Sequence, residues 1–98
     1  MANSETPVLI SGEKTVTTSG TAVALGTTQR VKSVTIIAKT SNTGQIYVGG
    51  SDIATTTNDG LDAGDSLTVD AVGWMDLSDI YLDADNDGEG ADFYAVKA

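Results

Sequence analysis

The feature that most constrains this chain is a series of short runs in which apolar and polar residues alternate. Gly, Asn or Asp separates these runs at intervals of about ten residues. Alternation with a two-residue period places successive side chains on opposite faces of a β-strand. Asp also outnumbers Glu by 11 to 3, which favours turns over helices. The sequence therefore predicts an all-β fold, a small antiparallel β-sandwich or jelly-roll-like barrel with six to eight short strands.

The longest predicted strand covers residues 31–39. Its apolar residues fall on both faces, so both faces are expected to be partly covered. Val31 and Ile37 lie on one face. The other face carries Val34, Ile36 and Ala38.

Two hairpins are predicted from turn signals. The alternating segment 45–48 follows a Ser-Asn-Thr-Gly turn and is expected to pair with 31–39. A Gly-rich, acidic loop separates 79–83 from 92–97, and these two segments are expected to pair as well.

Two neighbouring segments are expected to differ in structure. Residues 66–70 alternate and are predicted to form a strand that buries Leu67 and Val69. Residues 72–77 are predicted to form a loop or short turn with apolar anchors. Trp74 within this loop is expected to anchor either the core or a subunit interface.

The length of 98 residues predicts one domain at most, with a small core and no disulfides, because the chain has no Cys. Residues 1–13 are predicted to form an N-terminal arm or an edge strand, and residues 14–98 a single β-sandwich domain. In the arm, Val8, Leu9 and Ile10 are expected to pack on a neighbouring subunit. The first residues lack the basic and apolar stretches of a secretory signal, so synthesis in a cytoplasm is expected.

Charge and composition argue against several functions. Residues 1–50 carry 2 acids and 4 bases, whereas residues 51–98 carry 12 acids and 1 base, and the net charge is −9. A negative surface does not favour nucleic-acid binding. No apolar run approaches the roughly 20 residues of a membrane helix. The chain has neither His nor Cys, so we do not expect an enzyme.

One acidic loop has the spacing of a cation site. Asp83, Asp85 and Asp87 alternate, and Gly88 takes the sixth place, as at the start of a calcium loop. Tyr94 occupies the twelfth place, where a calcium loop has Glu, although Glu89 and Asp92 could substitute in a non-helical site. The sequence therefore leaves two readings open: a Ca²⁺ site, the one cofactor considered, or a solvated loop whose acids accept hydrogen bonds from the backbone.

Three motifs carry a resemblance to a known group of proteins. They are Asn-Thr-Gly-x-Ile-Tyr-Val-Gly at 42–49, Leu-x-x-Gly-x-Ser-x-x-x-Asp at 61–70 and Leu-Ser-Asp-Ile-Tyr-x-Asp at 77–83. With the strand that begins at residue 31, this pattern resembles small virion proteins of tailed bacteriophages. The resemblance implies a β-sandwich structural protein without catalytic residues. It would bind the outer head surface as a decoration or cement protein and stabilise it.

The resemblance also implies partners and a location. The partners would be the major capsid protein and other copies of the chain, as a homotrimer, on the capsid surface of the virion. In this arrangement Arg30, Lys32 and Lys39 are expected to face the shell. Two alternatives stay open: a tail or baseplate module that is structural or binds host glycans through Trp74 and the tyrosines, and a calcium-stabilised adhesion domain.

Overall fold

Residues 8–98 are described by the computed structural model, so part of the predicted arm, residues 1–7, lies outside the described residues. The described chain forms seven strands and one short 3₁₀ turn, η1 (Leu77–Asp79). The strands are β1 (Leu9–Val16), β2 (Val23–Ala24), β3 (Arg30–Ala38), β4 (Ile46–Gly49), β5 (Ser66–Asp76), β6 (Tyr81–Ala84) and β7 (Glu89–Lys97).

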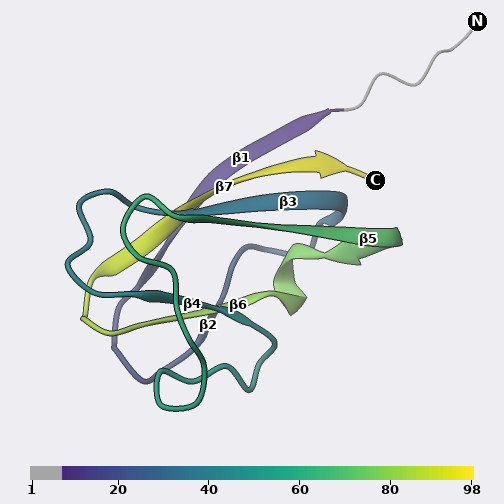
Figure 1. Ribbon diagram of the computed structural model, residues 1–98. Helices are drawn as coiled ribbons and strands as arrows, with labels where there is room; N and C mark the ends of the chain where they lie inside the picture. The colour runs from purple at the N-terminus through teal and green to yellow at the C-terminus, as the bar shows by residue number, and fades with distance from the viewer. Residues whose placement is uncertain (1–7) are drawn as a thin grey trace, which may run out of the picture.

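The strands form two antiparallel sheets that face each other (Figure 1). One sheet has the order β1-β7-β3-β5 and the other has the order β2-β6-β4. Leu61 adds a single bridge to Ile46 of β4, at the edge of the smaller sheet. The predicted all-β sandwich is therefore confirmed, with a strand number inside the predicted range.

Successive strands alternate strictly between the two sheets, so every connection crosses from one layer to the other. This winding, with the first and last strands side by side, is that of a jelly roll. Both predicted hairpins are therefore wrong. β3 pairs with β5 and β7, whereas β4 pairs with β6 in the opposite sheet. The segments 79–83 and 92–97 likewise belong to different sheets.

The core lies between the sheets and follows the period of two on β3. The predicted face of β3 is confirmed, because Val34, Ile36 and Ala38 are all buried. Val31 is also buried, although its spacing placed it on the other face. The reason is a register shift at Lys32, which turns the start of β3 over.

Strand β5 differs most from its sequence prediction. It runs without interruption from 66 to 76, so the predicted loop at 72–77 is mostly strand. Leu67 was expected to be buried but is 39% exposed, and Val69 is half-buried. Both lie on the outer strand of the wider sheet, where the smaller sheet gives less cover.

β1 forms the other edge of the wider sheet and pairs with β7 along its whole length. It runs through residues 13 and 14, where the sequence placed the boundary between arm and domain. Two glycines allow β1 and β7 to approach closely. Gly12 lies under the ring of Phe93, and a Cβ at Gly90 would collide with the backbone carbonyl oxygen of Lys14.

We expect Gly90→Ala to destabilise the protein by about 3 kcal/mol, because the added methyl group forces β1 away from β7. Gly50→Ala is the matched control, since its Cβ would meet only the flexible side chain of Asp52. Urea unfolding monitored by Trp fluorescence measures both. Equal midpoints for the two variants would contradict the packing described for β1.

Candidate functional site

The four carboxylates of the predicted cation loop bind two other loops of the protein. Asp87 accepts a hydrogen bond from the backbone amide of Ser19 at 2.7 Å, and Asp83 accepts one from that of Gly20 at 3.0 Å. Both amides belong to the connection from β1 to β2. Asp83 is 1% exposed, so its carboxylate is an internal acceptor for that loop.

Asp85 and Glu89 bind the connection from β3 to β4 instead. Glu89 accepts from the backbone amides of Thr43 at 2.7 Å and Gly44 at 3.0 Å. Asp85 accepts from the backbone amide of Gln45 at 2.9 Å. The acids at 83, 85, 87 and 89 thus alternate between two loops, an arrangement we call the carboxylate clamp.

These hydrogen bonds shift the titration of their partners. The backbone amides of Thr43 and Gly44 lower the pKa of Glu89 below its ordinary value of 4.5. The hydroxyl of Tyr47 donates to Asp85 at 2.8 Å, and this bond to the carboxylate raises the pKa of Tyr47. Tyr47 is buried beneath the loops. The two backbone amides therefore favour the ionised form of Glu89.

The structure does not gather these four carboxylates around one point. Within residues 8–98, no group of three or more Asp or Glu side chains is arranged to hold a metal ion. Each acid of the clamp is directed at a backbone amide of one of two loops. This geometry fits the second interpretation of the sequence, in which the acids accept hydrogen bonds from the backbone.

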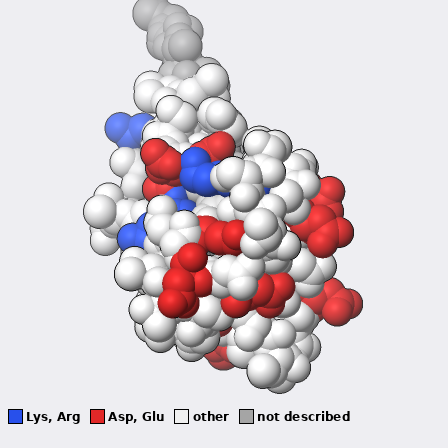
Figure 2. Space-filling view, turned by 90° about the vertical axis from the view of Figure 1, so that its left-hand side faces the viewer, with Lys and Arg blue, Asp and Glu red and all other residues white. Residues whose placement is uncertain are grey.

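The acids are concentrated at one end of the sandwich, which we call the loop end. The clamp lies there, and Asp62 and Asp65 belong to the connection that packs beside it. Figure 2 looks onto this side and shows Asp and Glu spread over its surface. The loop end is therefore an acidic surface.

The opposite end of the wider sheet carries exposed apolar side chains, and we call it the strand end. Val8 is 55% exposed, Leu9 77%, Val72 fully exposed and Trp74 51%. Val8 and Leu9 lie at the edge formed by β1, where Leu9 pairs with Val96 and the amide of Lys97 donates to the carbonyl oxygen of Val8 at 2.9 Å. Val72 and Trp74 belong to β5, the opposite edge strand, and β7 and β3 lie between the two edges. Figure 1 shows the ends of β1, β5 and β7 on this side.

Trp74 is held in place at the strand end. Residues 71–74 of β5 lie opposite the single residue Lys32 of β3, so this part of β5 bulges out of the sheet. Gly73, with φ of 94°, forms the tip of the bulge. The guanidinium carbon of Arg30 lies 4.1 Å from the centre of the Trp74 ring, a cation–π contact that orients the ring.

The predicted interface residues do not all lie in the same region of the structure. Val8, Leu9 and Trp74 lie at the strand end, whereas Ile10 packs partly against the core. Trp74 does not belong to the core, so that part of its prediction is wrong. Sequence reasoning missed Val72 as an exposed residue of this end. An apolar residue directly before an isolated Gly was the signal for an exposed tip.

The three bases predicted to face a shell do not share a surface. Arg30 is the first residue of β3, and Lys39 directly follows its last. At the usual rise of a strand, these two positions are about 30 Å apart. Arg30 and Lys32 belong to the strand end. Lys39 lies across β7 and binds Asp92 and Glu13, each at 2.7 Å, and these bonds raise its pKa above the ordinary 10.5.

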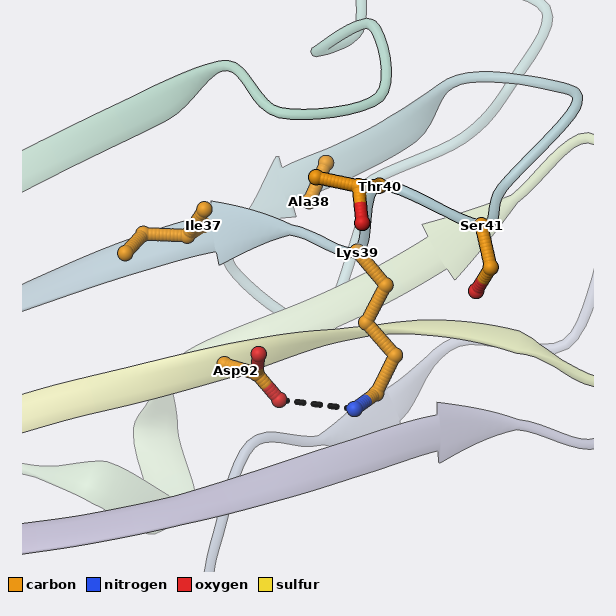
Figure 3. Close-up of a pocket in the computed structure, with 6 residues that line it drawn as sticks. All are labelled: Ile37, Ala38, Lys39, Thr40, Ser41 and Asp92. Atoms are coloured by element: carbon orange, nitrogen blue, oxygen red, sulfur yellow. Dashed lines mark hydrogen bonds and ion pairs between the residues drawn. The ribbon is translucent and has the colours of Figure 1, made fainter.

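Lys39 and Asp92 line a hollow of about 200 Å³ on the outer surface of the wider sheet (Figure 3). Ile37, Ala38, Thr40 and Ser41 form the rest of its wall. Of the residues described, no helix is long and apolar enough to cross a membrane.

Comparisons with protein-family models, with curated proteins and with solved structures found no match for this chain. The resemblance to bacteriophage virion proteins thus stays a prediction from sequence motifs.

The clamp predicts a specific dependence of stability on pH. Glu89 has a lowered pKa in the folded protein, so its contribution to stability is present in full above about 4.5, the unfolded value, and is lost as the pH falls through the lower folded value. Glu89→Gln replaces one of two accepting oxygens with a donor group. We therefore expect the variant to be less stable than the wild type at pH 7.

The difference between the two proteins should narrow steadily below pH 4.5, where the wild-type carboxylate becomes protonated. Urea midpoints measured from pH 7 to pH 3 test this expectation. Asp52→Asn is the control, because Asp52 is exposed and accepts no hydrogen bond from the described residues. A constant difference between Glu89→Gln and wild type across this range would contradict the ionic role of the clamp.

Proposed function

We propose that this protein is a structural component of a tailed-bacteriophage virion, most specifically a decoration or cement protein of the head. It binds the outer surface of the major capsid protein through the strand end, and its acidic loop end faces solvent. Its role is to stabilise the shell by contact, without catalysis.

The observation that carries this proposal is the separation of apolar and acidic groups along the sandwich. Leu9, Val72 and Trp74 are exposed at one end, and the carboxylate clamp lies at the other. Burying such apolar side chains in an interface contributes about 1.5–3 kcal/mol each when burial is complete. An exposed Trp beside a fixed Arg is also the composition of an interface hot spot.

The winding of the chain supports the proposal at the level of fold. Jelly rolls are frequent in viral capsid proteins, although they also occur in lectins and enzymes. The three motifs between residues 42 and 83 add the resemblance to virion proteins. A small domain also gains stability when a partner binds its folded form, which suits attachment to a shell.

Assembly around local symmetry axes fits the same picture. A homotrimer would repeat each contact three times on the shell, and closed symmetry limits the assembly. The free edges of β1 and β5 border the strand end and are available for contacts between copies. Light scattering after size exclusion measures whether the isolated protein is a trimer.

The first test is the number of copies in the particle. Particles are purified from a host culture that produces this chain, and quantitative mass spectrometry compares the chain with the major capsid protein. We expect hundreds of copies per particle. A few to dozens of copies would instead indicate the tail or baseplate alternative, and absence from particles would overturn the proposal.

The second test is rebinding to heads from which the chain has been stripped. We expect Trp74→Ala to weaken binding about 30-fold, the effect of a hot spot worth about 2 kcal/mol. Val72→Ser should also weaken binding. Tyr94→Ala is the matched control, because Tyr94 is 53% exposed on the sheet surface, away from the β5 bulge. Wild-type affinity in both strand-end variants would exclude this end as the contact.

A further inference from the structure

The outer surface of the wider sheet presents hydroxyl groups around one exposed aromatic ring. Tyr94 of β7 pairs with Ser11 of β1 on one side and with Thr35 of β3 on the other. Thr35 in turn pairs with Thr68 of β5, and their hydroxyl oxygens lie 2.9 Å apart. Four strands thus contribute one row of hydroxyl-bearing residues, with the half-exposed Tyr94 within it.

The hollow beside Lys39 adjoins this row. Asp92, which lines the hollow, lies two residues before Tyr94 on the same strand and therefore on the same face. The two positions are about 7 Å apart along β7. Ile37 pairs with Asp92 and supplies an apolar wall. A ligand in the hollow would accordingly lie next to the position of Tyr94 on the same face of the sheet.

The polar groups of the hollow have unused hydrogen-bonding capacity. Lys39 is held by Glu13 and Asp92 through one carboxylate oxygen of each. Within the described part of the chain, the second carboxylate oxygen of Asp92 and the hydroxyls of Thr40 and Ser41 make no hydrogen bond. Figure 3 shows both hydroxyls turned toward the side on which Lys39 and Asp92 lie.

Charge and size narrow the class of ligand. Two carboxylates surround one ammonium group, and the whole chain carries a net charge of −9, so anionic ligands are disfavoured. A hollow of about 200 Å³ lies below the roughly 300–1,000 Å³ that encloses a drug-sized molecule. A single ring with several hydroxyl groups and one apolar face matches both limits.

The geometry points to a binding site for a neutral saccharide on the outer surface of β3 and β7. One sugar ring stacks on Tyr94 or fills the adjoining hollow, while its hydroxyl groups bond to Asp92, Thr40 and Ser41. This inference is independent of the proposed function, because the site is separate from the strand end and uses none of its residues.

The test is a titration of the full-length protein, followed by backbone amide NMR shifts. The probes are glucose, galactose, mannose, N-acetylglucosamine and their common disaccharides, each added up to tens of millimolar. We expect saturable shifts for at least one probe, centred on residues 35–41 and 92–94. Sialic acid, which is anionic, should produce no saturable shift at these residues.

Two variants at the site and one control complete the test. Tyr94→Ala should weaken binding at least tenfold, and Asp92→Asn, which keeps the shape of the side chain, should also weaken it. Trp74→Ala should bind the sugar as the wild type does. Because Trp74→Ala is the variant expected to lose head binding, failure of one proposal is distinguishable from failure of the other.

The inference is overturned if no neutral probe gives saturable shifts, or if the shifts map away from β3 and β7. Unchanged affinity in a folded Tyr94→Ala variant would also overturn it. If Tyr94→Ala does not fold, Asp92→Asn takes its place as the test. Wild-type sugar affinity in Asp92→Asn would show that the hollow does not bind the sugar and would overturn the inference. Preferential binding of sialic acid would contradict the assignment to neutral sugars.

Discussion

The structure depends on carboxylates that accept hydrogen bonds from the loops. Every connection crosses between the sheets, so none is a tight hairpin, and several loop amides have no partner in a strand ladder. A loop amide without an acceptor costs about 1–3 kcal/mol when it is buried. Asp83, Asp85, Asp87 and Glu89 supply acceptors to two loops at once, and Asp76 does so for Gln29 and Ser78. Four of the 11 Asp residues thus have a role that follows from the winding of the chain.

The position of the clamp determines where the charged and the apolar surfaces of the protein lie. The clamp must be at the end where the connections β1–β2, β3–β4 and β6–β7 come together, so many of the acids collect there. The long strands β1, β5 and β7 bring exposed apolar residues to the opposite end. Acidic ends of neighbouring copies repel one another and favour solvent. An orientation with the strand end against a partner therefore places each kind of surface in the environment that suits it.

Local features of the fold could be predicted from the sequence, but the pairing of strands could not. Val34, Ile36 and Ala38 were assigned to one face because a two-residue period is a property of a single strand. Alternation does not say which strand is the neighbour, so both hairpins were wrong. The spacing of Asp83, Asp85 and Asp87 was noticed, but spacing does not show whether carboxylate oxygens turn toward an ion or toward amides that lie 40 or more residues away in the chain. Val31 was misplaced because the register shift at Lys32 depends on two partner strands.

The two proposed surfaces can be used by one molecule at the same time, because they occupy different parts of the same sheet. Trp74 and Val72 lie on the bulge opposite Lys32, at the start of β3, whereas the hollow lies at its end beside Lys39. Lys39 also links the end of β3 through β7 to the edge strand β1, because it binds both Asp92 and Glu13. A copy attached by its strand end would leave this surface open to solvent. Many copies on one particle would then present weak saccharide sites together, and multivalent attachment can raise the overall affinity far above that of a single site.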